Sequence, residues 1–223
     1  MKLHRFFVPK ELVQGRVIKI TDHALTKQIA KVLRLEASQE IMLLDGDGFE
    51  YIMRLSHVAV KEVIGEILKR QVNESEPSIK ITLYQALLKK DNIEWAFQKC
   101  TEVGVHNFVP VQTERSEKLR MNRDRAEKII KEAAEQSGRG IIPALADPQN
   151  FGETIKRLSR GDTPIVLLTG DGDPIGSYSL GSRLYAVNLF VGPEGGWSED
   201  ELTLTRDLMK DGYPVHMLSI GPR

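Results

Sequence analysis

One stretch of the 223-residue sequence says most about the fold: Val191-Gly192-Pro193-Glu194-Gly195-Gly196-Trp197-Ser198-Glu199-Asp200-Glu201. The apolar residues 184–190 before it predict a buried strand. Ser198, followed three residues later by Glu201, matches a capping box and predicts the start of a helix. The glycines between strand and helix let the backbone pass close to a bound molecule, and we expect positive φ at Gly195. The stretch therefore predicts a strand, a ligand-accessible loop and a helix.

A second loop of similar composition closes the sequence. The apolar residues 215–218 predict a strand, and Ser219-Ile220-Gly221-Pro222-Arg223 follows it. Loops at the carboxyl ends of parallel strands are where open α/β sheets bind ligands. The same residues also fit two tight turns without any ligand. The residues alone leave both interpretations open.

Strands and helices alternate through the C-terminal part of the sequence, which indicates an α/β domain. The predicted strands are residues 79–83, 108–111, 165–168, 186–191 and 215–218. One predicted helix has Asp91 or Asn92 as its N-terminal cap. Three further helices are predicted over residues 124–137, 151–158 and 198–209. The glycines of residues 170–176 do not have Rossmann spacing and precede no helix start, so a dinucleotide site is rejected there.

The first 72 residues predict a small β-rich module with one helix. Asp22 is the expected cap of that helix. A turn signal at residues 45–48 separates two short apolar runs and predicts a hairpin. The polar residues 73–78 contain Pro77, a helix breaker, and mark the domain boundary. We therefore expect one domain over residues 1–72 and another over residues 78–223.

Composition excludes several classes of protein. The sequence has 31 basic and 31 acidic residues, which argues against strong non-specific binding of nucleic acid. Cys100 is the only cysteine, so no intrachain disulfide forms and a reducing cytoplasm is the expected compartment. No apolar run is long enough for a membrane span or a signal peptide. No cluster of ligands has the spacing of a metal site.

Several segments in order match one known family: His4-Arg5-Phe6-Phe7-Val8, Lys99, Glu102-Val103-Gly104-Val105, Pro110, Glu114-Arg115-Ser116, Glu132-Ala133-Ala134-Glu135-Gln136-Ser137-Gly138-Arg139, Pro143, and the two Gly-Pro loops. On these segments the chain resembles the bacterial 16S ribosomal RNA (uracil-N3)-methyltransferases of the SPOUT superfamily. Together the matches span nearly the whole sequence, whereas each alone would be a weak signal.

The resemblance implies an α/β fold in two parts. The C-terminal part would be a SPOUT-type trefoil-knotted α/β domain, and the N-terminal part a small PUA-like β-barrel that binds RNA. It also implies a homodimer with the site at the subunit contact. Pattern alone would never justify a knot, because knotted chains are so rare.

The resemblance further implies the cofactor S-adenosyl-L-methionine and 16S ribosomal RNA as partner. The residues expected to hold the cofactor lie in three loops: Leu168, Thr169, Gly170, Gly192, Pro193, Glu194, Gly195, Gly196, Leu218, Ser219, Ile220 and Gly221. The expected reaction is methylation of N3 of a specific uridine. The alternatives are a non-catalytic RNA-binding or ribosome-assembly protein, and a SPOUT methyltransferase acting on another RNA.

The expected catalytic groups follow from the chemistry of uracil. N3 carries a proton and becomes nucleophilic only when that proton leaves, so the enzyme needs a general base or positive charge. Arg115, Arg139 and Arg223 are the candidates for positive charge, and Glu135 is a candidate base. The basic residues between 115 and 139 also fit an ordinary solvated helix face. Lys99 and Glu102 are expected to pair with each other.

The sequence departs from the family pattern at its end. In that family a further helix follows the Gly-Pro-Arg motif and helps to complete the cofactor pocket and the dimer contact. Here the sequence stops at Arg223, so this helix is not part of it. A shortened product and an incompletely given sequence are both compatible with this departure.

Overall fold

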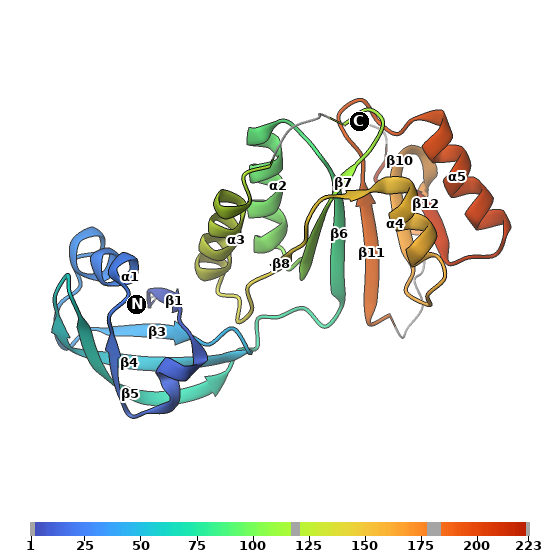
Figure 1. The fold of residues 1–223 in the computed structure, drawn as a ribbon. Coiled ribbons are helices and arrows are strands. Elements are labelled where there is room, and N and C mark those ends of the chain that lie inside the picture. Colours follow the sequence, from blue (N-terminus) through green and yellow to red (C-terminus); the bar gives the residue numbers. More distant parts are fainter. Residues whose placement is uncertain (1–2, 117–120, 178–183, 222–223) are drawn as a thin grey trace. The chain divides into compact units, whose positions relative to one another are not determined.

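A computed structural model describes residues 3–116, 121–177 and 184–221, and the chain divides into two units (Figure 1). The first unit consists of residues 1–76 together with residues 131–142, and the second of residues 77–130 and 143–223. The sequence did not indicate that residues 131–142 join the first unit. They belong to it because Ala134 packs in one apolar cluster with Phe7, Met42 and Leu44.

The first unit is a five-stranded sheet with the order β1-β3-β4-β5-β2. Its strands are β1 (Arg5–Phe7), β2 (Val17–Ile20), β3 (Glu40–Leu44), β4 (Phe49–Val58) and β5 (Val63–Val72). β1 pairs with β3 in parallel, and the other pairs are antiparallel. The predicted hairpin is confirmed as β3 and β4. The core of the first unit contains Ile18, Ile41, Leu43 and Met53, all almost fully buried.

The helical segments of the first unit are short. A 3-10 helix, η1 (Lys10–Gln14), precedes β2, and α1 (His23–Lys27) follows it. Asp22 caps α1 as expected, because its side chain accepts the Leu25 N–H. The expected helix then changes its hydrogen-bonding pattern and continues as a π-helix, η2 (Gln28–Val32). The sequence pattern did not reveal this change.

The second unit is a parallel sheet with the order β12-β10-β11-β6-β7-β8, in which β9 also pairs with β7. Its strands are β6 (Lys80–Ala86), β7 (Asn107–Gln112), β8 (Ala144–Leu145), β9 (Gln149–Asn150), β10 (Ile165–Pro174), β11 (Ala186–Val191) and β12 (Val215–Ser219). The five predicted strands are confirmed, although β10 runs six residues beyond Leu168. A short 3-10 turn, η3 (Ile175–Ser177), follows β10, and no α-helix starts within residues 170–177.

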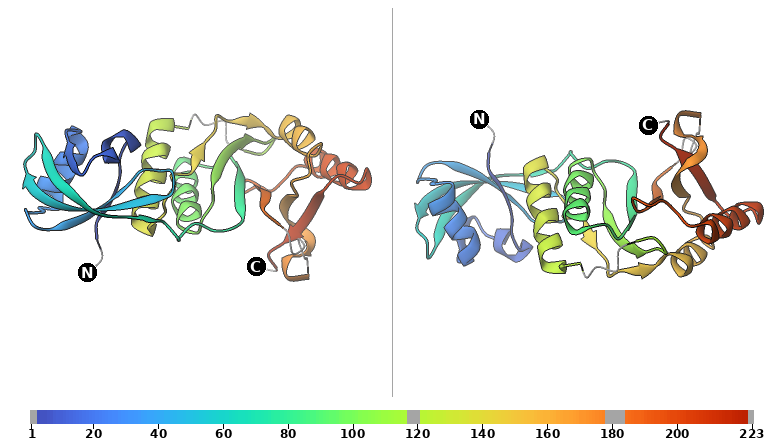
Figure 2. Two further views of the ribbon diagram at one scale, coloured as in Figure 1. Left: turned by 90° about the horizontal axis from the view of Figure 1, so that it is seen from below. Right: turned by 90° about the horizontal axis from the view of Figure 1, so that it is seen from above.

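Helices cover both faces of this sheet. α2 (Lys90–Glu102) and the first part of α3 (Arg123–Ser137) pack on one face, where Phe97 and Ile130 are buried. α4 (Phe151–Leu158) and α5 (Glu199–Lys210) pack on the other, beside each other (Figures 1 and 2). The capping box of Ser198 and Glu201 is confirmed. The expected cap of α2 is wrong, because Asn92 lies inside the helix and its side chain bonds to Glu194 instead.

Candidate functional site

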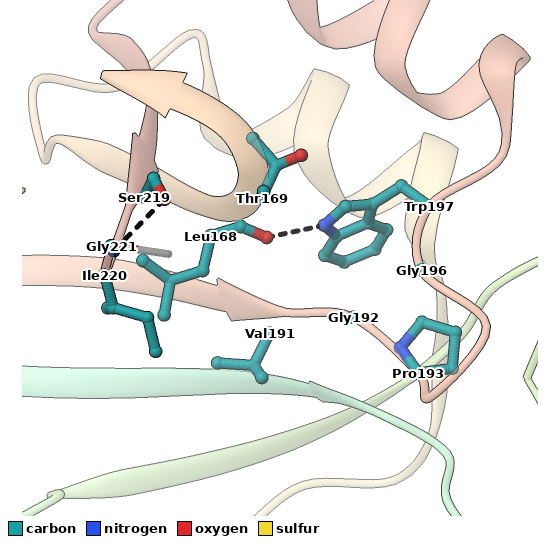
Figure 3. Close-up of a pocket in the computed structure, with 11 residues that line it drawn as sticks. Leu168, Thr169, Val191, Gly192, Pro193, Gly196, Trp197, Ser219, Ile220 and Gly221 are labelled. Carbon is teal, nitrogen blue, oxygen red and sulfur yellow. Dashed lines mark hydrogen bonds between the residues drawn. The ribbon is translucent and has the colours of Figure 1, made fainter. Parts of the chain in front are cut away.

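Three loops of the second unit surround one cavity of about 500 Å³ (Figure 3). The first loop begins after Leu168 within β10, the second follows the end of β11, and the third follows the end of β12. These three strands are neighbours in the parallel sheet. Parallel strands place their carboxyl ends at one edge, so loops far apart in sequence converge there. The cavity is lined by Leu168, Thr169, Gly170, Val191, Gly192, Pro193, Gly196, Trp197, Ser219, Ile220 and Gly221.

The lining is mostly backbone. A Cβ atom added to Gly170, Gly196 or Gly221 would meet no atom within 4 Å, so these residues leave the space beside the loops open. Gly196 has φ +69° and Gly221 has φ +103°, a conformation that L side chains rarely adopt. Positive φ was expected at Gly195 and occurs at Gly196 instead, because the turn closes with the Gly196 N–H bonding to the Pro193 carbonyl. Amide and carbonyl groups therefore dominate the polar surface that the cavity offers.

Trp197 connects two of the three loops. Its Nε1–H donates to the Leu168 carbonyl oxygen at 2.8 Å (Figure 3). Its ring centroid lies 4.9 Å from that of Phe151 in the core. A Cβ on Gly192 would lie 3.0 Å from the indole ring, so any larger residue would require the ring to move away slightly. Trp197 was not among the residues predicted for this site. A bulky aromatic residue inside a glycine-rich loop was the signal that could have identified it.

The path of β10 shapes the opposite side of the cavity. Leu168 pairs with Leu218 of β12, the register then shifts, and Asp173 pairs with Leu218 again. At this point a Cβ on Gly172 would lie 2.6 Å from the Leu218 backbone. Glycine is therefore required where the two strands rejoin.

Nine of the predicted cofactor-binding residues line this cavity, and three do not. Leu218 is buried beneath it, only 2% exposed. Glu194 accepts a hydrogen bond from Asn92 Nδ2 at 2.6 Å, and the pKa of its carboxyl is lowered by its own backbone N–H and by Asn92. Gly195 accepts a hydrogen bond from Arg115 Nη1 at 3.0 Å. Glu194 and Gly195 thus hold the loop in place, and the cofactor role of all twelve remains a prediction.

Arg115 is the predicted catalytic residue that the structure places beside these loops. It follows β7, and the neighbouring Glu114 N–H donates to Glu201 at the start of α5. Arg115 is exposed and uses one N–H for the Gly195 carbonyl. A guanidinium has five N–H groups, so donors remain for another molecule.

Arg139 belongs to the first unit and is buried there. Its side chain is 3% exposed, and its guanidinium pairs with Glu76, with Nη2 2.7 Å from Oε2. Glu76 also accepts the N–H groups of Gly140 and Ile141. Burial raises the pKa of Glu76, but Arg139 and the two amides lower it by more, and the net shift is downward. The charge of Arg139 is therefore matched by a carboxylate in this arrangement.

Glu135, the candidate base, also belongs to the first unit. One carboxylate oxygen accepts the Phe7 N–H at 2.9 Å, and Lys131 Nζ lies 4.0 Å away. Burial raises the pKa of this carboxyl, although the Phe7 N–H and Lys131 act in the opposite direction. A raised pKa brings a carboxylate nearer the range useful for proton transfer. Arg223, the last candidate, lies outside the described residues.

Many basic residues between 115 and 139 form ion pairs. Arg123 pairs with Glu127 and Asp147, and Arg125 with Glu94. The expected pair of Lys99 with Glu102 is confirmed at 2.9 Å.

Among the described residues, no group of His, Cys, Asp and Glu is arranged to hold a metal ion. None of the helices within the described ranges has the length and apolar character that a membrane span requires.

Comparison with known sequences and structures identifies relatives over the whole chain. The family described as "RNA methyltransferase domain" matches residues 74–222, and "RNA methyltransferase PUA domain" matches residues 29–68. The ribosomal RNA small subunit methyltransferase E of Synechocystis is 33% identical over 96% of this chain and 70% of its own length. That of Bacillus subtilis is 30% identical over 99% of this chain and 90% of its own length.

Solved structures show the same relationship. Ribosomal RNA small subunit methyltransferase E of Neisseria gonorrhoeae, bound to S-adenosylmethionine, has a TM-score of 0.88 and 26% identity, covering 100% of this chain and 90% of its own. A Legionella pneumophila protein with bound S-adenosylmethionine has a TM-score of 0.84 and 28% identity, covering 100% and 91%.

These relationships confirm the expected fold class, an α/β domain of the SPOUT type with a PUA-like N-terminal domain. The trefoil knot itself stays a prediction. With family matches over both domains and close relatives along its length, the chain belongs to the RNA methyltransferase family, among the ribosomal RNA small subunit methyltransferases E.

Proposed function

We propose that this protein methylates N3 of one uridine in 16S ribosomal RNA, with S-adenosyl-L-methionine as methyl donor. The single observation that carries the proposal is the glycine-lined cavity where β10, β11 and β12 deliver their loops. The names of the relatives support a ribosomal RNA substrate, and the two solved relatives contain the proposed cofactor.

The residues that line the cavity fit this cofactor. A volume of about 500 Å³ lies within the range of small-molecule sites, roughly 300–1,000 Å³. Backbone amides and carbonyls of the three loops suit the polar edges of adenosine and the amino-acid part. Ile220 is 60% exposed, and with Leu168 and Val191 it supplies apolar surface for a ring. The nine predicted residues that line the cavity would make these contacts, together with Val191 and Trp197.

The bound cofactor supplies an electrophilic methyl group on a sulfonium ion, and the protein supplies position and charge. N3 of uracil must lose its proton before it attacks, and the resulting negative charge is shared with the neighbouring carbonyl oxygens. Arg115 is placed to stabilise that charge, since the loop contact to Gly195 occupies only one of its N–H groups. Arg139, Glu135 and Arg223 remain candidates from the sequence, and no step is assigned to them.

We further propose that residues 1–72 form the RNA-binding domain, and that the protein acts as a cytoplasmic homodimer. Apolar surface in the second unit supports the dimer. One apolar cluster contains Val166, Val187 and Leu218. Among the described residues, its members come only from strands and the residues beside them, and no helix contributes to it. A second subunit would bury the partly exposed residues at its edge, Leu168 and Leu189.

The proposal is tested with small ribosomal subunits from a strain that lacks the gene. These subunits are incubated with the protein and S-adenosylmethionine, and the RNA is digested for mass spectrometry. We expect a single 3-methyluridine. Reverse transcription should stop at the same site, because N3 lies on the Watson–Crick edge and its methylation blocks pairing.

Each other outcome contradicts a particular part. A methyl group on another atom or another RNA would refute the substrate assignment. Cofactor binding by calorimetry without any methylation would favour the non-catalytic alternative. Absence of cofactor binding would refute the assignment of the cavity.

A further inference from the structure

The first unit contains a cavity of its own, about 270 Å³ in volume. It is formed by β1 and the residues before it, by the two ends of the π-helix η2, and by the last turn of α3. All of these elements belong to the first unit. The lining residues are Leu3, His4, Arg5, Phe6, Gln28, Leu33, Glu135 and Gln136.

Arg5 lacks the partner that a half-buried arginine needs. Its Nε is buried and makes no hydrogen bond, and the described residues offer its guanidinium no ion pair. A Cβ on Gly138 would lie 3.5 Å from Arg5 Cζ, so the guanidinium packs close to the end of α3. Removing a charged group from water without a partner is unfavourable, so such groups are usually paired or bind a ligand.

Four other arginines of the same unit have a partner, and Arg34, for which the described residues offer no ion pair, is exposed to water whereas Arg5 is partly buried. Arg16 pairs with Glu66, Arg54 with Glu40, and Arg139 with Glu76. Arg70 lies over the Phe49 ring at 3.7 Å. Arg5 forms no ion pair with any described carboxylate, including Glu135 on the wall of the same cavity, which accepts the Phe7 N–H instead. A guanidinium without a carboxylate partner can bind an anion that offers two oxygens, above all a phosphate.

The remaining polar residues of the cavity suit a nucleobase. Gln28 and Gln136 are exposed at its rim, and each carboxamide carries both a donor and an acceptor. The Glu135 carboxyl has a raised pKa because it is buried, and it already orients toward β1 by accepting the Phe7 N–H. Leu3 and Leu33 supply apolar walls. Paired donors and acceptors between apolar walls are what the edge and faces of an unpaired base require.

The backbone around this cavity is unusual. Gln28 and Leu33 stand at the two ends of the π-helix, where the Leu33 N–H bonds to the Gln28 carbonyl. Arg34 follows with φ +51°, a conformation that costs energy for any residue other than glycine. π-helical turns and such conformations occur often at functional sites. Here the π-helical turn sets the spacing between Gln28 and Leu33 on the cavity wall.

We propose that this cavity binds one unpaired nucleotide of the RNA substrate, with its phosphate at Arg5 and its base against Gln28, Gln136 and Glu135. This inference rests on the proposed function, because it takes the substrate to be RNA. The cavity volume is about 270 Å³. Sites for drug-sized ligands begin at roughly 300 Å³, so this cavity suits a ligand no larger than one nucleotide. The cavity is distinct from the one lined by the glycine loops.

The test compares Arg5→Gln with Arg54→Gln in the full chain. Arg54 is a paired, exposed arginine of the same unit, so its replacement removes the same charge outside the cavity. Affinity for small ribosomal subunits is measured at several salt concentrations. We expect Arg5→Gln to weaken binding roughly tenfold and to reduce the slope of log affinity against log salt by about 1, and Arg54→Gln to do neither. Gln28→Leu should weaken binding with the salt slope unchanged, because a base contact releases no counterion.

Two further measurements decide between roles. Thermal unfolding of Arg5→Gln should occur at the same or a higher temperature, because an unpaired charge is removed. A clear loss of stability with unchanged affinity per folded molecule would mean that Arg5 is structural and would overturn the inference. Binding losses with intact subunits but none with protein-free ribosomal RNA would assign the cavity to a ribosomal protein, and would also overturn it.

The outcome is separable from that of the proposed function. Cofactor affinity, measured by calorimetry, should be the same in Arg5→Gln and in the unchanged protein. If the unchanged protein binds subunits through Arg5 but methylates nothing, only the proposed function fails. If it methylates normally while Arg5→Gln keeps full affinity and the full salt slope, only this inference fails.

Discussion

The two cavities of this protein are built from different materials. Backbone groups and glycines line most of the cavity in the second unit, and its outline depends on where three strands stop. Ionisable and amide side chains line much of the cavity in the first unit. A backbone-lined site depends on local conformation, whereas a side-chain-lined site depends on charge and its partners. The two units should therefore respond to different kinds of substitution.

The largest effect is expected for Arg139→Ala in the first unit. This change leaves Glu76 in a largely enclosed site without its partner, and breaking such a pair typically costs about 3–5 kcal/mol. Denaturant unfolding measures the loss. Cofactor affinity, measured where the protein is still folded, should be retained. Unchanged stability with lost methylation would instead return Arg139 to the role predicted from sequence, contact with RNA.

The same pair makes stability depend on pH. The pKa of Glu76 is lower in the folded protein than its usual value of 4.5, so the pair stabilises the fold above that pH. This contribution is lost as the pH falls through the folded-state pKa. The difference in stability between Arg139→Ala and the unchanged protein should therefore shrink in acid.

Glycine substitutions should separate conformation from binding in the second unit. Gly196→Ala and Gly212→Ala both place a Cβ at positive φ with open space around it, so each should cost about 1–2 kcal/mol of stability. Only Gly196 lines the cavity. We expect cofactor affinity, measured by calorimetry, to fall tenfold or more for Gly196→Ala alone. Equal affinities for the two variants would refute the assignment of the cavity.

Trp197→Phe should have a smaller effect on the same cavity. Phenylalanine keeps the packing against Phe151 but removes the hydrogen bond to the Leu168 carbonyl. Loss of one such bond corresponds to about 1 kcal/mol, or roughly a fivefold weaker affinity for the cofactor. The control is Trp95→Phe, since Trp95 is 63% exposed on α2. Similar losses in both variants would show that Trp197 does not position the loop.

Glu135→Gln should have the smallest effect and the opposite sign. Burial raises the pKa of Glu135 above 4.5, so its ionised form opposes folding and stability is lost as pH rises through the folded-state pKa. Glutamine removes the charge but can still accept the Phe7 N–H. We expect stability at pH 7 to stay equal or rise by less than about 1 kcal/mol, with the gain vanishing in acid. A marked loss would mean that the pair with Lys131 matters more than burial.

The difference between the two cavities also explains what the sequence could reveal. Glycine positions, the capping box at Ser198 and the apolar strands are local patterns, and they predicted the strands, the loops that follow them and the start of α5. The resemblance to a family added nine of the residues that line the cavity of the second unit. The exact position of the left-handed turn, Gly196 rather than Gly195, depends on a hydrogen bond that no residue type specifies.

Contacts between distant residues were not predictable in this way. Arg139 and Glu76 are 63 positions apart, and neither lies in a motif that names the other. The same holds for Asn92, which was expected to cap a helix and instead binds Glu194, 102 positions away. Side chains that meet across such separations are fixed by the assembled fold. Two segments that line the cavity of the first unit, residues 4–8 and 132–139, matched the family pattern, but the sequence did not show that they meet.

The division of α3 between the two units has a consequence for synthesis. Ala134 completes the apolar cluster around Phe7, Met42 and Leu44, yet it is translated long after them. At ordinary rates of roughly 5–20 residues per second, residues 77–142 take several seconds to emerge. Through that interval the nascent first unit exposes part of its core to solvent. The growing chain must therefore begin its second unit before the first can close.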